Sequence, residues 1–295
     1  MNEIEKIWFS RIKISNRVKR NLAKKFGSIK SFYNCSLDDL VYFNVSDKYI
    51  KEILDLNLRK RIFDEYEYLK QNSIGILSFE DDEYPMKLRQ IDDFPLVLFY
   101  KGDINILGND GVGIVGSRFA LNWSLRKSKE IAKEFSKIGI NVISGLARGV
   151  DKYAHLGCID NIQKEKIGAG KTVAVLGSGI DKLSFYPQEN YRVFERIIDY
   201  GGCVLTEYPI GTKPVSYNFP YRNRIISGLS EKLIIIQAGQ KSGSLITVEY
   251  ALEQGKDIYV IKPDLSLDLY YFKGNIELIN QGAKIYENTE KLILN

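Results

Sequence analysis

After Gly111 the sequence repeats one pattern six times, and this repetition constrains the fold more than any other feature. Short apolar runs end in glycine or a small polar residue, and each precedes a stretch with helical periodicity; the runs are VGIV, INVI, TVAVL, CVLT, KLIIIQ and DIYVI. Near-continuous Val, Ile and Leu runs alternating with helices are typical of parallel strands covered on both faces. The pattern predicts a doubly wound, mostly parallel α/β sheet, which binds ligands beyond the carboxyl ends of its strands.

The residues before Gly111 follow a different pattern. Residues 1–72 contain short apolar-periodic pieces separated by turns, such as KYIKEILDLNLRKRIFDEYEYLK, and predict a small helical domain. Residues 73–110 hold two extended pieces, around Tyr84-Pro85 and Phe94-Pro95, and we expect a connector that also forms an edge of the sheet domain. The sheet domain itself should span residues 111–295.

Composition excludes several classes of protein. No apolar run approaches the roughly 18 residues of a membrane span, and the N-terminus lacks the apolar centre of a signal peptide, so we expect a cytoplasmic protein. The three cysteines are far apart and the chain has a single histidine, which argues against disulfides and zinc. We expect neither a metal nor a cofactor.

The net charge of +5 is concentrated at one end of the chain. Residues 1–73 carry 15 basic against 10 acidic side chains, and the charges of the remaining residues cancel. An anion site in the sheet domain must therefore be local, built from individual arginines and backbone N–H groups.

Gly/Ser loops follow four of the predicted strands. They are GSR (116–118), SGLARG (144–149), GSG (177–179) and KSGS (241–244). Glycines in such loops leave N–H groups at the start of the next helix, where the helix dipole favours a phosphate. A single loop would be read more simply as an ordinary strand-to-helix turn, but four at one sheet edge favour an anion site.

Nucleotide-binding fingerprints and catalytic motifs are poorly represented. GVGIVG (111–116) matches G-x-G-x-x-G as a string, but residues 112–115 are the strand itself, and no P-loop sequence occurs. His155 lies four residues after Asp151 without a nucleophile motif to serve, so a structural role is favoured. Glu249, one turn into a predicted helix, could serve a hydrolase or be a solvated first-turn acid.

Aromatic and basic residues are interleaved between the later strands. Tyr186, Tyr208, Tyr217, Phe219 and Tyr221 alternate with Lys182, Lys213, Arg222 and Arg224. A groove for single-stranded nucleic acid requires this mixture, because bases stack on rings and phosphates pair with cations. Packing of loops on the sheet is the alternative for most of the tyrosines.

Taken in chain order, these loops resemble the motifs of the DNA processing protein A family (DprA, also called Smf). The matching segments are GSR (116–118), SGLARGVDKYAH (144–155), AVLGSGIDKLSFYPQEN (174–190), TEYPIGTKPVSYNFPYRNRIISGLS (206–230), SGSLITVEYALEQG (242–255) and GNIELINQGA (274–283). The resemblance covers residues 111–287 in unbroken order. The segment FGSIKSFYNCSLDDL also resembles the family's small helical domain of the SAM or helix-hairpin-helix kind.

The resemblance implies an extended Rossmann-like fold and a protein without enzymatic activity. Such a protein binds incoming single-stranded DNA during natural transformation, usually as a homodimer, and helps to load the RecA recombinase. The DNA-binding residues it implies are Arg118, Gly145, Leu146, Ala147, Asn190, Phe219, Arg222 and Arg224. To these the loops and neighbouring cations add Gly116, Ser117, Lys213, Lys241, Ser242 and Gly243.

This chain departs from the family pattern in several places. Ser216 stands where some relatives have a basic residue, so a phosphate contact is absent or moves to Lys213. Ile236-Gln237-Ala238 replaces Val-Glu-Ala, residues 161–171 form a charged insert, and the sequence ends before the winged helix that many relatives add.

Two alternatives belong to other functional classes. One is a Rossmann-type nucleotide hydrolase resembling the lysine-decarboxylase-like phosphoribohydrolases, for which GSLITVE is a poor match to PGGxGTxxE. The other is an interaction protein whose basic residues 1–73 do the binding.

The two arginines of FPYRNRIISGL are expected to face different ways. If residues after Pro220 are helical, 100° per residue places Arg222 on the stripe of Ile225, Ile226 and Leu229. Arg224 then points roughly 200° away from Arg222, toward DNA or an acidic neighbour. We favour Arg222 as the residue that contacts DNA.

Overall fold

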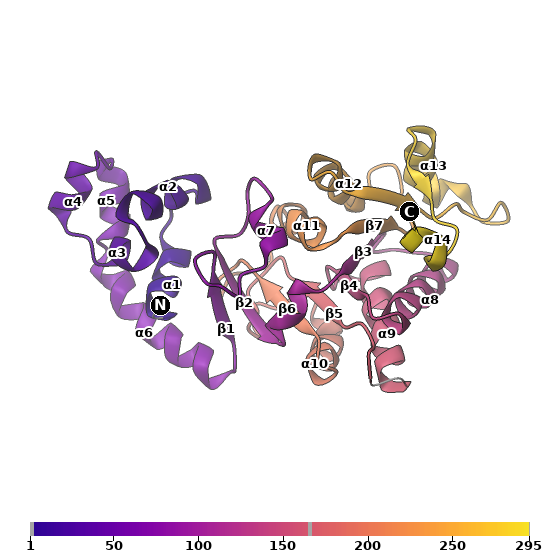
Figure 1. Ribbon diagram of the computed structural model, residues 1–295, viewed down its shortest axis with the longest axis horizontal. Coiled ribbons are helices and arrows are strands. Elements are labelled where there is room, and N and C mark those ends of the chain that lie inside the picture. The colour runs from indigo at the N-terminus through magenta and orange to yellow at the C-terminus, as the bar shows by residue number, and fades with distance from the viewer. Residues whose placement is uncertain (1–2, 165–166, 295) are drawn as a thin grey trace.

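One nine-stranded sheet forms the centre of the computed structural model, which describes residues 3–164 and 167–294 (Figure 1). Residues 165–166 of the 161–171 insert lie outside this description. The sheet order is β1-β2-β6-β5-β4-β3-β7-β8-β9; β2 runs antiparallel to β1 and β6, and the other neighbours are parallel. The strands are β1 (Gly75–Ser78), β2 (Val97–Gly102), β3 (Gly111–Val115), β4 (Asn141–Ser144), β5 (Thr172–Val175), β6 (Cys203–Thr206), β7 (Lys232–Ile235), β8 (Asp257–Val260) and β9 (Lys284–Ile285). The predicted doubly wound, mostly parallel fold is confirmed.

The winding of the sheet reverses between β3 and β7. From β3 the chain steps outward through β4, β5 and β6, then returns across the sheet to β7 and continues to β8 and β9. β3 and β7 are direct neighbours, with Val115 opposite Ile235. Open α/β sheets bind ligands outside the carboxyl ends of their strands at such a reversal.

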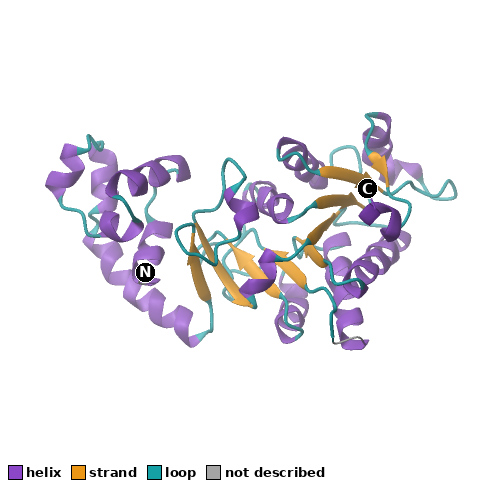
Figure 2. Cartoon of the chain, in the orientation of Figure 1, coloured by secondary structure: helices purple, strands orange, loops and turns teal. Residues whose placement is uncertain are grey.

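Helices cover both faces of the sheet (Figures 1 and 2). One face carries α8 (Asn122–Lys137), α9 (Val150–Lys164) and α10 (Tyr191–Asp199), and the other carries α7 (Met86–Arg89), α11 (Asn218–Leu229) and α12 (Gly243–Glu253). Leu233 and Ile235 of β7 pack beneath α11 and α12, whereas Ile234 and Ile236 join the core beneath α8 and α9. Burial on both faces explains why the strand sequences are continuous apolar runs.

The C-terminal elements follow β8. They are α13 (Lys273–Asn280), β9 and α14 (Thr289–Leu294). Three short 3₁₀ helices complete the secondary structure of the described residues: η1 (Ile104–Gly108), η2 (Gln188–Asn190) and η3 (Leu269–Phe272). None of the helices within residues 3–164 and 167–294 combines the length and the apolar character needed to cross a membrane.

Within residues 3–74, six helices precede the sheet. They are α1 (Glu3–Arg11), α2 (Asn16–Phe26), α3 (Ile29–Tyr33), α4 (Leu37–Tyr42), α5 (Asp47–Ile53) and α6 (Leu56–Gln71). Trp8 and Phe9 of α1 share one apolar cluster with Ile76 of β1 and Phe99 of β2. An ion pair of 2.7 Å between Lys6 and Asp81 reinforces the contact. The helical segment is therefore packed against the antiparallel edge of the sheet.

Residues 73–110 contribute β1 and β2 to that edge. Neither strand includes the X-Pro pairs around which extended pieces were predicted. Tyr84-Pro85 immediately precedes α7, and Phe94-Pro95 precedes β2. Proline has no N–H to donate to a sheet ladder, which explains why the strands avoid both pairs.

Candidate functional site

An open cavity of about 390 Å³ lies where the winding reverses. Residues after β3, after β4, in α11 and at the start of α12 meet there; the lining is Val115, Gly116, Ser117, Arg118, Phe119, Ala147, Asp151, Ser216, Phe219, Pro220, Arg222, Asn223, Ile226, Ser242, Gly243, Ser244 and Thr247. Three of the four predicted Gly/Ser loops therefore share one cavity. The fourth is not part of the lining but packs against Phe219, because a Cβ on Gly177 would come within 2.7 Å of the Phe219 ring.

The backbone of the loop after β3 is hydrogen-bonded to Gln237, and two of the loop's side chains are exposed to solvent. The Ser117 N–H donates to the Gln237 carbonyl oxygen at 2.7 Å, and the Leu121 N–H donates to Gln237 Oε1 at 2.9 Å. Ser117 Oγ accepts from the Phe119 N–H at 3.1 Å. Gln237 is buried, whereas Arg118 and Phe119 are exposed. Glutamine at position 237 thus shapes the turn that presents Arg118, and a glutamate oxygen could accept from Leu121 in the same way.

Arg222 lies at the bottom of the cavity. Its Nη1 donates to the carbonyl oxygens of Gly145, at 2.8 Å, and of Val175. The expected direction of its guanidinium, toward the strand ends, is confirmed. A Cβ at position 145 would lie 2.4 Å from Arg222 Nη2, so a side chain there would displace the guanidinium.

Arg222 and Asp151 set the electrostatics of the cavity floor. Burial lowers the pKa of Arg222 to about 10, although the Asp151 carboxylate opposes this shift, so the guanidinium is still charged at neutral pH. Burial likewise raises the pKa of Asp151, against the influence of Arg222 and of the backbone N–H of Ala147. Each group therefore opposes the pKa shift of the other, but burial has the larger influence on both.

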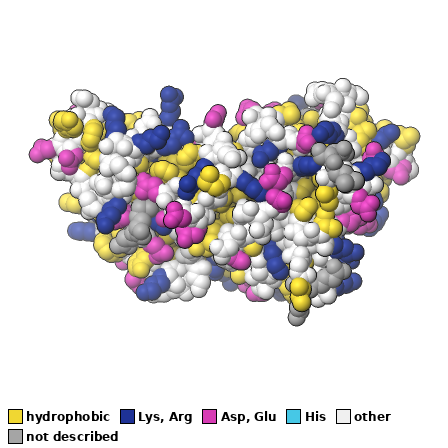
Figure 3. Space-filling view, viewed as in Figure 1, with side chains coloured by type: hydrophobic (Ala, Val, Ile, Leu, Met, Phe, Trp, Pro, Cys, Tyr) yellow, Lys and Arg dark blue, Asp and Glu magenta, His cyan; other side chains and the backbone are white. Residues whose placement is uncertain are grey.

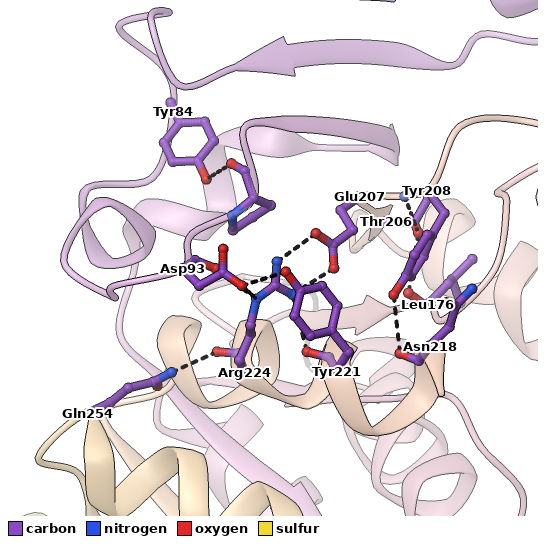
Figure 4. A network of polar contacts seen from close by, with 11 residues as sticks. Tyr84, Asp93, Leu176, Thr206, Glu207, Tyr208, Asn218, Tyr221, Arg224 and Gln254 are labelled. Carbon is purple, nitrogen blue, oxygen red and sulfur yellow. Dashed lines mark hydrogen bonds and ion pairs between the residues drawn. The ribbon is translucent and has the colours of Figure 1, made fainter. Parts of the chain in front are cut away.

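Arg224 occupies a separate network on another side of α11 (Figure 4). Its Nη1 and Nη2 donate to the two carboxylate oxygens of Glu207 at 2.6 Å, its Nε donates to the Asp93 carbonyl oxygen at 2.7 Å, and its guanidinium lies 3.8 Å from the Tyr221 ring centroid. Burial alone would lower its pKa, but Glu207, Tyr221 and Asp93 together outweigh burial and the net shift is upward. Of the two orientations expected for Arg224, the structure shows the acidic neighbour.

Two aromatic rings flanked by two cations form a row that starts in the cavity lining and continues beyond it. The Arg118 guanidinium lies 5.2 Å from the Phe219 ring centroid, the Phe219 and Tyr186 centroids are 5.6 Å apart, and the Arg148 guanidinium lies 5.4 Å from the Tyr186 centroid. Glu189 pairs with Arg148 at 2.9 Å and holds it in place. Tyr186 and Arg148 are not among the predicted DNA-binding residues, although Tyr186 belongs to the interleaved aromatic set and Arg148 to the SGLARG loop.

Two of the predicted residues support the cavity without lining it. Asn190 is buried, and its Nδ2 donates to the carbonyl oxygens of Leu146 at 3.0 Å and Ala147 at 3.1 Å. Leu146 has a φ of 52° and a buried side chain. Together they fix the loop after β4, and a direct contact of either with DNA stays a prediction.

The remaining predicted cations are on the surface. Lys213 is exposed in the segment before α11, and the cavity lining given above does not include it. Lys241 is exposed at the rim of a neighbouring hollow. Contacts of both with DNA stay predictions.

The groups considered for catalysis lie elsewhere. His155 is fully buried with Nδ1 2.7 Å from Thr172 Oγ1, and burial, with Arg222 nearby, lowers its pKa to about 3. Glu249 is exposed on α12, whereas the residues that α12 contributes to the cavity lining are Gly243, Ser244 and Thr247. Among the described residues, no three His, Cys, Asp or Glu side chains are grouped so that they could hold a metal ion.

Fold and site together define a Rossmann-like α/β protein with an arginine-lined, open cavity at the switch point of its sheet. The chain belongs to the family described as DNA recombination-mediator protein A, whose model matches residues 75–295.

Two curated relatives show the extent of the likeness. The chain is 39% identical over 236 residues to DNA processing protein DprA of Streptococcus pneumoniae, covering 77% of this chain and 75% of that protein. It is 36% identical over 250 residues to protein Smf of Synechocystis, covering 83% of this chain but only 60% of that protein.

Two solved structures share the fold. DNA processing protein A from Streptococcus pneumoniae superposes with a TM-score of 0.78 and 30% identity, covering 99% of this chain and 96% of that one. DNA processing protein A from Helicobacter pylori, whose structure is described for its single-stranded DNA binding mode, gives a TM-score of 0.63 and 28% identity, covering 75% of this chain and 94% of that one.

Proposed function

We propose that this protein binds single-stranded DNA across the cavity at the carboxyl ends of β3 and β7, without a chemical step. The observation that carries the proposal is the pair of Arg118 and Phe219 in the cavity lining, beside the buried Arg222, and its continuation beyond the lining to Tyr186 and Arg148. Family membership and the single-stranded DNA binding described for the Helicobacter pylori relative support it.

The arrangement suits a single strand better than a duplex. In a single strand the base faces are free to stack on Phe219 and Tyr186, whereas in a duplex neighbouring bases already occupy them. Phosphates between the stacked bases would pair with Arg118 at the surface and approach Arg222 from the open side. Because the charges of residues 74–295 cancel, we expect these local contacts to supply most of the affinity. Figure 3 shows basic and acidic side chains intermixed on the face in view.

We further propose the family role for this chain: a homodimer that protects incoming single-stranded DNA in natural transformation and loads the RecA recombinase on it. The sequence resemblance across residues 111–287 and the match of the family model support this role. The position of Glu249 outside the cavity lining gives the nucleotide-hydrolase alternative no structural support.

A gel-shift titration with single-stranded and double-stranded oligonucleotides, run at two salt concentrations, tests the binding proposal. We expect tighter binding of the single strand at both concentrations, weakening as salt rises. Equal binding of both forms, or binding that salt does not change, would contradict the proposal.

Separate assays test the recombinase and the dimer. The protein should accelerate RecA filament formation on oligonucleotides coated with single-strand-binding protein, and light scattering should give twice the mass of one chain. Turnover of nucleoside monophosphates that is lost in Glu249→Ala would instead revive the hydrolase.

A further inference from the structure

A second hollow, of about 500 Å³, adjoins the arginine-lined cavity. The two share Ser117, Phe119 and Ser242 in their linings, so they form one continuous depression. Beyond the shared residues, the second hollow is lined by Gln237, Gly239, Gln240, Lys241, Tyr270, Tyr271 and Lys273. Neither family motifs nor the proposed site accounts for its two tyrosines.

The rings of this hollow are open to solvent. Phe119 is 83% exposed, Tyr270 66% and Tyr271 42%. The next residue, Phe272, behaves differently: it is fully buried, with its ring centroid 6.0 Å from that of Trp123. One ring of η3 thus anchors the turn to the protein, and the two before it remain available to a ligand.

The charges around these rings favour a polyanion. Lys273 Nζ lies 4.7 Å from the Tyr270 ring centroid, and Lys241 is exposed on the facing loop. The described residues that line the hollow include these two lysines and no aspartate or glutamate. Asp268, which is exposed and accepts from the Tyr270 N–H at 2.9 Å, lies outside this lining. Open aromatic rings beside cations provide stacking platforms for bases and partners for phosphates.

We propose that Tyr270 and Tyr271, with Lys241 and Lys273, form a second stacking subsite, hereafter the tyrosine subsite, which continues the path of single-stranded DNA past Arg118. Phe119 lines both hollows and connects the subsite to the first cavity. The inference rests on the proposed function, since it extends the same bound strand.

Oligonucleotides of two lengths distinguish binding at the first cavity from binding at the tyrosine subsite. Fluorescence anisotropy would give Kd values of a dT4 and a dT12 probe for the wild type, for the double variant Tyr270→Ala/Tyr271→Ala and for Arg118→Ala. Tyr42→Ala serves as the matched control, because Tyr42 is 79% exposed in the helical segment.

The tyrosine subsite predicts a loss restricted to the long probe. The double variant should weaken dT12 binding by about tenfold or more, as expected for stacking of at least one base, and leave dT4 binding unchanged. Arg118→Ala should weaken both probes, and Tyr42→Ala neither. An unchanged dT12 affinity of the double variant, while Arg118→Ala weakens binding, would overturn the subsite alone; absence of binding by the wild type would overturn the proposed function.

Photo-cross-linking gives an independent readout. A dT12 series with 5-iododeoxyuridine at successive positions should yield, on irradiation and peptide mapping, a cross-link to the peptide containing Tyr270 and Tyr271. If no position cross-links there while another labels the peptide with Phe219, the strand does not follow this path.

Discussion

Arg222 and Arg224 lie two residues apart on α11 and are buried almost equally, at 3% and 2% exposure, yet their surroundings differ. Arg224 is matched to Glu207 in a two-pronged ion pair and packs against Tyr221. Arg222 instead donates to strand-end carbonyls and shares a cavity floor with Asp151, whose pKa is raised by burial. The exposed fraction of a buried arginine therefore does not distinguish a structural role from a binding role. The presence or absence of a carboxylate paired with its guanidinium does.

The largest effect on binding is expected from Arg222→Ala. Removing a desolvated, hydrogen-bonded cation from a binding site typically costs at least about 2 kcal/mol, so the Kd for single-stranded DNA should rise by roughly 30-fold or more. Arg222→Lys should give an intermediate value, because it keeps the charge but loses the fork of donors. Fluorescence anisotropy measures the Kd of both variants, and circular dichroism checks that they are folded. A folded Arg222→Ala protein with wild-type affinity would contradict the claim that Arg222, unlike Arg224, serves DNA binding.

Arg224→Met should change stability instead. It leaves the Glu207 carboxylate, 9% exposed, without its cation, and breaking such a buried pair costs about 3–5 kcal/mol of unfolding free energy. The Kd for DNA should stay within about threefold of wild type below the melting transition. Urea denaturation measures the stability, and Glu207→Gln/Arg224→Met should be more stable than Arg224→Met alone. A DNA-binding defect as large as that of Arg222→Ala would show that both arginines serve the ligand.

A smaller effect is expected from pH at the cavity floor. Protonation of Asp151, whose pKa is raised, removes a negative charge beside Arg222, so DNA affinity should increase as the pH falls from neutral toward the raised pKa of Asp151. The pKa values of Arg222, about 10, and His155, about 3, lie outside this window. In Asp151→Asn the increase, on the order of fivefold, should be absent. An equally steep pH profile in the variant would assign it to another group.

The difference between the two arginines also shows what sequence can predict. The strands followed from apolar runs, and the divergence of Arg222 and Arg224 followed from helix geometry, because both are local properties. The carboxylate that neutralises Arg224 could not be predicted, since Glu207 lies after β6 and Asp93 lies 131 residues away in the chain.

The same limit applies to the site residues. Arg118 could be placed at the cavity because it directly follows a strand, whereas the supporting role of Asn190 depends on two carbonyl oxygens from another loop. Tyr270 and Tyr271 could not be predicted as site residues from the sequence. The pairing of β3 with β7 brings together the loops that follow these two strands, and the turn after β8 lies beside them.

The salt dependence of single-stranded DNA binding by Arg118→Ala tests the central claim most directly. Arg118 is the exposed cation at the cavity mouth, and Arg192→Ala, exposed on α10 and outside the cavity lining, is the control. If the strand crosses the cavity, Arg118→Ala should weaken binding of all sequences about equally. It should also reduce the slope of log Kd against log salt by roughly one counterion, while the control leaves both unchanged. Unchanged affinity and slope in Arg118→Ala would contradict the claim that DNA binds in this cavity.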